Sequence, residues 1–152
     1  MNQLLEDQVL LLSPQFENAG GSLRLHCEQT WEVETDPRAV KLILMNLLEN
    51  ALKYGGDLPT CEVLAKESGK QIEIVVSDGG AGVERSEQKA IFRKFYQGDA
   101  ELRRGKSGVG LGLAICRQFA RLLKGEIYVA DSAEGEGASF VFTVPFAGGG
   151  KC

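Results

Sequence analysis

The chain has 152 residues, of which 43% are hydrophobic and 25% are charged, and its formal net charge at pH 7 is −4. This composition is typical of one soluble globular domain with a single core. An acidic chain is not expected to bind nucleic acid, because domains that do so usually carry a concentrated basic face. No apolar run approaches the about 20 residues that are needed to cross a bilayer.

The apolar pattern alternates between the periods of helices and of strands. It predicts a helix at 3–18, strands at 22–27 and 31–34, a helix at 36–54, strands at 61–66 and 71–77, a short helix at 85–95, a helix at 111–124, and strands at 126–130 and 139–144. Pro14 would kink or divide the first helix. Asp36 followed by Pro37 is typical of a helix start. We therefore expect an α+β fold, a two-layer α/β sandwich whose mixed, mostly antiparallel sheet is covered on one face by helices.

The cysteines are far apart and form no Cys-x-x-Cys pair: Cys27, Cys61, Cys116 and Cys152. We expect reduced thiols with mostly structural roles, which indicates a cytoplasmic domain, whether or not the parent protein is anchored to a membrane.

The helix predicted at 36–54 carries a polar stripe beside its apolar side. The stripe consists of Asn46, Glu49, Asn50 and Lys53, at positions i, i+3, i+4 and i+7. A solvated face would use better helix formers than asparagine. An amide oxygen is a hard, neutral ligand that suits Mg²⁺ bound to phosphate. The stripe therefore predicts a site for Mg²⁺ and phosphate.

A carboxylate, Asp78, stands at the end of the strand predicted at 71–77 and is followed by Gly79, Gly80 and Gly82. Taken alone, this segment reads as an ordinary turn. Together with the asparagine stripe, it makes Asp78 a candidate acceptor for an exocyclic amine such as that of adenine. The glycines let the chain approach a flat ligand closely.

Glycines at 108, 110 and 112 open the helix predicted at 111–124. Backbone N–H groups at such a start can turn toward an anion. The basic cluster Arg103, Arg104 and Lys106 lies just before it, which suits a small phosphorylated ligand better than a polymer. We expect residues 97–107 to be the least ordered internal segment until phosphate engages these bases.

These segments resemble the catalytic, ATP-binding domain of two-component sensor histidine kinases, in the superfamily that also holds the gyrase, Hsp90 and MutL ATPase domains. The resemblance covers residues 20–146 and the motifs stand in the family's order: Asn46-Leu-Leu-Glu-Asn50-Ala-Leu-Lys53-Tyr54, Asp78-Gly-Gly80-Ala-Gly82, Ile91-Phe92-Arg-Lys-Phe95-Tyr96, Gly108–Leu113 and Gly135-Glu-Gly137-Ala-Ser-Phe140. It implies the sandwich known as the Bergerat fold.

The resemblance also implies a role for each motif residue. Catalytic roles would fall to Asn46, Asn50 and Lys53: Asn50 would coordinate Mg²⁺ with Asn46 in support, and Lys53 would reach phosphate. The other ATP-binding residues would be Tyr54, Asp78, Gly80 and Gly82 at the base, Phe92 and Phe95 anchoring a lid, and Arg103, Arg104, Lys106, Gly108, Gly110, Leu111 and Gly112 at the phosphates. Three positions depart from the family pattern, namely Gln97, Val109 and Ala138.

Phosphoryl transfer also needs a nucleophile. In histidine kinases the acceptor histidine lies on a helical hairpin, whereas the only histidine of this sequence, His26, lies on an alternating strand and is expected at the surface. The resemblance therefore implies a separate partner, the phosphoacceptor-histidine helical domain of the parent kinase, and indirectly a response regulator.

We expect the isolated chain to be a monomer. Residues 1–18 would be a remnant of a connecting helix, residues 19–146 the ATP-binding domain and residues 147–152 a flexible tail.

Three other functions share parts of this pattern. A gyrase-type hydrolase would need a proton acceptor at the position of Asn46, and an amide cannot accept a proton at neutral pH. A serine kinase of the anti-sigma-factor kind shares the boxes, although the tyrosine at residue 96 favours the histidine kinases. A nucleotide-binding or scaffold module without kinase activity is the third alternative.

Overall fold

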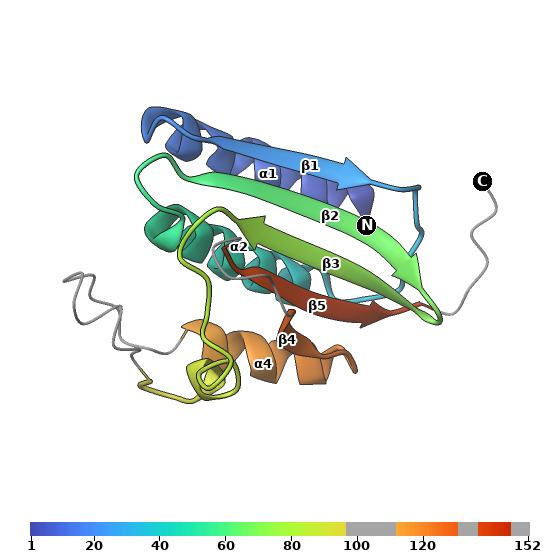
Figure 1. Ribbon diagram of the computed structural model, residues 1–152. Coiled ribbons are helices and arrows are strands. Elements are labelled where there is room, and N and C mark those ends of the chain that lie inside the picture. The colour runs from blue at the N-terminus through green and yellow to red at the C-terminus, as the bar shows by residue number, and fades with distance from the viewer. Residues whose placement is uncertain (97–111, 131–136, 147–152) are drawn as a thin grey trace.

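The computed structural model describes residues 1–96, 112–130 and 137–146 (Figure 1). Its elements are α1 (Asn2–Asn18), β1 (Ser22–Cys27), α2 (Pro37–Tyr54), β2 (Thr60–Ser68), β3 (Gln71–Asp78), the 3-10 turn η1 (Ala90–Phe92), α4 (Gly112–Leu122), β4 (Ile127–Ala130) and β5 (Ser139–Pro145). The strands form one five-stranded sheet in the order β1-β2-β3-β5-β4.

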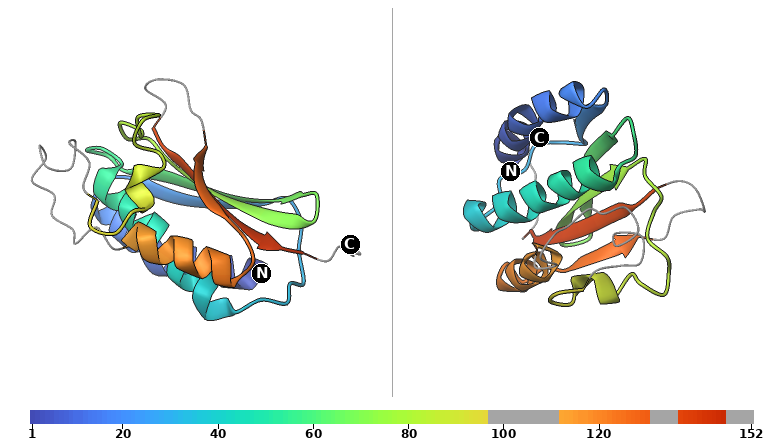
Figure 2. Two further views of the ribbon diagram at one scale, coloured as in Figure 1. Left: turned by 90° about the horizontal axis from the view of Figure 1, so that it is seen from below. Right: turned by 90° about the vertical axis from the view of Figure 1, so that its left-hand side faces the viewer.

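The sheet is mixed, because β1 pairs with β2 in parallel while the pairs β2–β3, β3–β5 and β4–β5 are antiparallel. Helices α1, α2 and α4 lie together on one face of the sheet, as both views of Figure 2 show. The prediction of an α+β sandwich with a mixed, mostly antiparallel sheet and one helix-covered face is therefore confirmed. None of the helices in the described ranges is long and apolar enough to cross a membrane.

The core lies between the sheet and the helices and follows from the two sequence periods. Alternate strand residues such as Val63, Ile74 and Phe142 point toward the helices and are buried. Along α2, residues at helical spacing such as Ile43 and Leu47 fill the space against them. This packing leaves the polar stripe of α2 on a different side of the helix, where it can face a ligand.

Helix α1 is continuous through Pro14, so the expected division of the helix at this residue is not present. Leu12 and Phe16 flank the proline and are buried, which holds both halves of the helix against the sheet. Pro14 itself is exposed. Because Leu5 is also buried, α1 is packed along its length into the same core as the rest of the fold. The domain boundary at residue 18 stays a prediction.

The expected strand at 31–34 is wrong, because this segment is irregular. The backbone N–H of Trp31 donates to the side chain of Asn2, and its indole N–H donates to Glu67 Oε2 at 3.3 Å. Its backbone groups thus bond to α1 rather than to a neighbouring strand. Trp31 has only 1% of its surface exposed, which explains the apolar signal.

The expected helix at 85–95 is reduced to a series of turns around η1, which covers only Ala90–Phe92. Phe92 is buried, and it supplied the apolar signal that suggested a longer helix. The other predicted elements are present, and none of their ends differs from the predicted position by more than two residues.

Candidate functional site

Helix α2 presents the polar stripe at a fixed place because its start and its apolar side are both held. Asp36 Oδ1 accepts a hydrogen bond of 2.9 Å from the backbone N–H of Arg38, which caps the helix as the sequence predicted. Asn46, Asn50 and Lys53 are half-buried, whereas Glu49 is exposed. The stripe therefore lies partly in contact with other parts of the fold and is not a uniformly solvated face.

The amide of Asn46 is oriented by its own helix. Its Nδ2 donates to the carbonyl oxygen of Leu42 at 2.9 Å, which leaves Oδ1 as the atom that points away from the helix. A Cβ atom on Gly112 would lie 2.9 Å from that Oδ1. The start of α4 thus lies against Asn46, and the absence of a side chain at residue 112 keeps the amide oxygen accessible.

Asp78 ends β3, and its carboxylate is held by two backbone donors. Oδ1 accepts hydrogen bonds from the N–H of Gly80 at 2.8 Å and from the N–H of Ala138 at 3.3 Å. Neither bond uses Oδ2, so this oxygen keeps its capacity to accept from a ligand. Burial raises the pKa of Asp78 above its ordinary value, while the two backbone hydrogen bonds act in the opposite direction.

The segment after β3 packs closely on two neighbours. A Cβ atom on Gly80 would lie 2.2 Å from the carbonyl oxygen of Tyr54, the last residue of α2. Gly82 has a φ of +82° and lies against Gly137. These contacts bring the loop after β3 to the end of α2 and to the segment that enters β5.

A cavity of about 80 Å³ lies where these segments meet. It is lined by Asn50 and Tyr54 from α2 and by Asp78, Ala81, Gly82 and Val83 from the end of β3 and the loop that follows. Ala138, just before β5, and Phe140, in β5, complete the lining. The lining thus has one carboxylate and one amide in an otherwise largely apolar and aromatic surface. Such a surface is suited to a flat heterocycle with an exocyclic amine.

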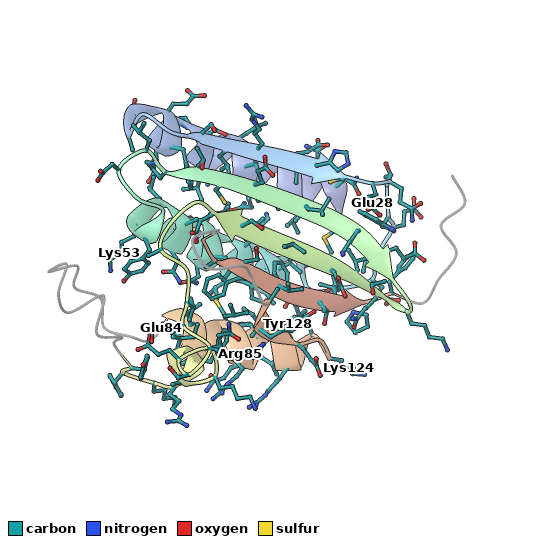
Figure 3. All side chains as sticks on the ribbon, viewed as in Figure 1. Glu28, Lys53, Glu84, Arg85, Lys124 and Tyr128 are labelled. Atoms are coloured by element: carbon teal, nitrogen blue, oxygen red, sulfur yellow. The ribbon has the colours of Figure 1, made fainter. Side chains whose placement is uncertain are left out.

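Four residues that the sequence suggested for one site share this cavity: Asn50, Tyr54, Asp78 and Gly82. Gly80 lies beside it through its contact with Tyr54. Lys53 lies in the last turn of α2, next to Tyr54, and is labelled in Figure 3. Its Nζ is 5.2 Å from the centre of the Tyr54 ring.

The two phenylalanines that were expected to anchor a lid differ in their surroundings. Phe92 is 4% exposed, and its ring meets that of Phe140 edge to face at a centroid distance of 6.4 Å. Phe95 is 69% exposed. Phe92 is therefore packed in the core, where it supports the wall of the cavity through Phe140, whereas Phe95 is not; their role in anchoring a lid stays a prediction.

Sequence reasoning missed two lining residues, Ala81 and Val83. A short loop after a strand has no period that could single out an apolar residue as a contact for a ligand. Phe140 stood in a quoted motif without an assigned role, although its place on an alternating strand beside Ala138 was a usable signal.

Several expected phosphate-binding residues lie outside the described ranges: Arg103, Arg104, Lys106, Gly108, Gly110 and Leu111. The lid expected at 97–107, with Gln97, and Val109 lie outside them as well. Among the described residues, there is no group of three or more histidine, cysteine, aspartate or glutamate side chains that could hold a metal ion.

A larger cavity of about 370 Å³ also reaches Asp78, but it is lined by strand residues such as Arg24, Glu62 and Ser77 and by none of the α2 side chains. The smaller cavity combines the chemically distinctive groups, and we take it as the candidate site. Together the sandwich and this cavity define a class of α+β domain whose candidate site lies between the end of α2, the loop after β3 and the start of β5.

Comparison with known proteins agrees with this class. Residues 35–148 match the family described as histidine kinase-, DNA gyrase B-, and HSP90-like ATPase. The chain is 38% identical over 110 residues to the circadian input-output histidine kinase CikA of Synechococcus elongatus, covering 72% of this chain and 14% of that protein. It is 38% identical over 116 residues to the adaptive-response sensory kinase SasA of Crocosphaera subtropica, covering 74% of this chain and 29% of that protein.

Solved structures give the same result. Full-length ShkA in complex with AMPPNP superposes with a TM-score of 0.83 at 28% identity, covering 95% of this chain and 30% of that one. The catalytic domain of the histidine kinase ThkA superposes with a TM-score of 0.83 at 22% identity, covering 95% and 91%, and this supports the fold. The chain belongs to the histidine kinase-, gyrase B- and HSP90-like ATPase family. It spans less than a third of the length of the two curated relatives named above, at 14% and 29%.

Proposed function

We propose that this chain binds Mg²⁺-ATP in the cavity between α2, the loop after β3 and the start of β5, and that it donates the γ-phosphate to a histidine on a separate helical phosphoacceptor domain. The observation that carries the proposal is the meeting of Asn50, Tyr54 and Asp78 in one cavity. The similarity to ShkA, whose structure contains AMPPNP, supports it.

Recognition of the base would rest on Asp78. Its Oδ1 is occupied by the N–H groups of Gly80 and Ala138, so Oδ2 is the oxygen that would accept a hydrogen bond from the adenine amine. The ring of Tyr54 and the apolar wall around Phe140 would contact the faces of the base. Guanine has a carbonyl oxygen where adenine has the amine, and this oxygen would face a carboxylate. The site is therefore expected to select ATP over GTP.

The phosphates would extend from the cavity toward the start of α4, where Asn46 meets Gly112. Amide oxygens of Asn50 and Asn46 suit Mg²⁺, and the remaining ligands would be phosphate oxygens and water. When bound, the ion would offset negative charge on the phosphates. The bond from Nδ2 of Asn46 to Leu42 already fixes the amide so that its oxygen is the exposed atom. Lys53 would supply a positive charge at the same end of α2.

The transfer step needs a nucleophile from the partner. An unprotonated ring nitrogen of the acceptor histidine would form a bond to the γ-phosphorus, the bond from that phosphorus to the β,γ-bridging oxygen would break, and ADP would leave. His26 is exposed on β1, and β2 separates that strand from β3 and Asp78. Asn46 cannot take a proton from water, so neither self-phosphorylation nor appreciable hydrolysis is expected from the chain alone.

Two measurements test the proposal. Calorimetric titration with ATP, ADP and GTP, each with and without Mg²⁺, should give a low- to mid-micromolar Kd for the adenine nucleotides, about −6 to −8 kcal/mol. Mixing the chain with the phosphoacceptor helices of its parent kinase and γ-labelled ATP should transfer label to the helices and then to a response regulator. Equal binding of ATP and GTP would contradict the role of Asp78. Multiple-turnover phosphate release without a partner would favour a hydrolase, and nucleotide binding without any transfer would favour a regulatory module.

A further inference from the structure

Strand β1 is at one end of the sheet, and the described ranges contain no strand that pairs with its outer edge. The N–H groups of Ser22 and Glu28 donate to carbonyl oxygens of the β2 side, at Pro59 and Ala65. Backbone groups alternate in direction along a strand. Those of the odd-numbered residues Leu23, Leu25 and Cys27 therefore point away from β2, toward the open edge.

A groove of about 600 Å³ runs along this edge, between β1 and α1. Figure 1 and the right-hand view of Figure 2 show α1 beside β1 at this end of the sheet. Leu25 and Cys27 line the groove from the strand, and Val9 and Leu10 line it from the helix. Leu10 has 71% of its surface exposed, so its side chain is available to contact a ligand in the groove.

The groove also has polar and charged lining residues. Asn2 and Gln29 line it just beyond the end of β1, where Asn2 Nδ2 donates to the carbonyl oxygen of Gln29 at 2.8 Å. Glu6 is the charged residue among those that line it. Glu6 and Cys27 line the same groove, and the pKa of the Cys27 thiol is raised by burial and further by the Glu6 carboxylate.

We infer that this groove binds an extended peptide that adds to the edge of β1 as a further strand, with an apolar side chain beside Leu25 and Leu10 and a basic side chain two residues away beside Glu6. An unpaired strand edge is complementary to another extended backbone, and side chains two residues apart on a strand point to the same face. The proposal does not depend on nucleotide binding.

A second copy of β1 matches the groove less well than such a peptide. Its side chains on the helix side would again be Leu23, Leu25 and Cys27, none of which is basic. Arg24 alternates with these residues and so points to the opposite face. Pairing of two copies would therefore bring no basic side chain of β1 to Glu6.

The probe is a synthetic peptide with the sequence Thr-Lys-Thr-Val-Thr-Lys-Thr, acetylated and amidated. Its symmetry places valine beside Leu25 and a lysine beside Glu6 whether it binds parallel or antiparallel to β1. Binding should slow hydrogen exchange at the amides of Leu23, Leu25 and Cys27, measured by NMR, and should saturate in a titration. The control peptide carries N-methyl groups on the valine and on both adjacent threonines, which removes the backbone donors, and it should not bind.

Matched pairs of variants distinguish peptide binding in the groove from binding elsewhere on the surface of α1. Leu10→Lys should weaken the peptide Kd about tenfold, since it removes apolar contact and adds a like charge, whereas Leu11→Lys, exposed on the next helix position, should change it less than about twofold. Glu6→Lys should weaken it similarly, with Asp7→Lys as its control. Equal binding of the N-methylated peptide, unchanged exchange at the three amides, or equal effects of the two leucine variants would each overturn the proposal. A dimer of the chain that slows exchange at the same amides without peptide would overturn it in favour of self-pairing.

Discussion

A Cβ atom on Gly80 would lie 2.2 Å from the carbonyl oxygen of Tyr54, far inside the distance that two such atoms tolerate. Gly80 follows β3, and Tyr54 ends α2, so this contact joins the loop that carries Asp78 to the helix that carries Asn50. Both helix and loop contribute side chains to the cavity. The glycine is therefore required by packing, in addition to any contact that it makes with a base.

Changing Gly80 to Ala should lower the free energy of unfolding by about 1–3 kcal/mol, because the backbone must shift to admit the methyl group. ATP binding should weaken as well, since the shift moves Asp78 relative to Asn50. Chemical denaturation and calorimetric titration measure the two effects. Gly79→Ala is the matched control: its Cβ would approach only the side-chain oxygen of Thr60, at 3.1 Å, and that side chain can rotate. Equal effects of the two variants would show that the contact with Tyr54 does not matter.

Phe92 and Phe95 should respond very differently to truncation. Phe92→Ala should cost about 3–5 kcal/mol of stability and weaken ATP binding, because Phe92 is 4% exposed and its ring supports Phe140 in the cavity wall. Phe95→Ala should change stability by no more than about 0.5 kcal/mol, because that side chain is 69% exposed. Thermal unfolding of both variants checks this. A large loss for Phe95→Ala would mean that Phe95 anchors the segment after all.

The sequence predicted the parts of this fold that depend on local period and local chemistry. The cap by Asp36 follows from the residue types Asp36 and Pro37, the buried side of α2 follows from spacing, and both are present. Because that helix is placed correctly, Asn50 also reaches the cavity that the motif order suggested. The alternation that predicted β3 likewise delivers Asp78 to its end.

Contacts between distant residues could not be predicted in this way. Trp31 is buried through bonds with Asn2 and Glu67, and no local pattern indicates either partner. The apolar residues of the segment around Phe92 suggested a helix, yet packing of one ring into the core needs only a turn. Val83 lines the cavity because the loop after β3 folds back on α2, which depends on the whole site.

Cys61 and Cys116 should resist alkylation in the folded chain. Burial raises the pKa of each thiol to about 12, and for Cys61 the Asp78 carboxylate adds to this effect. At pH 8 the reactive thiolate would then be roughly one part in ten thousand. Treatment with iodoacetamide followed by mass spectrometry should modify Cys27 first among the three described cysteines, because it is half-buried. In urea all three should react, and rapid labelling of Cys61 in the native chain would mean that the end of β2 opens readily.

Changing Asp78 to Asn should weaken ATP binding while making the nucleotide-free chain more stable. The N–H groups of Gly80 and Ala138 would hold the amide oxygen in the position of Oδ1, so the amide nitrogen would replace Oδ2. A donor would then face the adenine amine, at a cost of about 1–3 kcal/mol, or about 5- to 150-fold in Kd. The fold would gain because a carboxylate whose ionisation is disfavoured by burial has been removed.

The stability gain of Asp78→Asn should depend on pH. Because the pKa of Asp78 is raised by folding, the native chain binds a proton more tightly than the unfolded chain, and the free energy of unfolding contributed by Asp78 falls as pH rises through the interval between the ordinary and the raised pKa. The loss is complete above the raised pKa. The melting temperature of the variant should therefore exceed that of the native chain most at pH 7 to 8, and the difference should shrink as pH is lowered toward about 4. Asp57→Asn, in the exposed turn after α2, should change neither melting temperature nor ATP affinity. If Asp78→Asn lowers both the melting temperature and the ATP affinity at pH 7, the carboxylate stabilises the loop after β3 and does not act mainly by recognising the base.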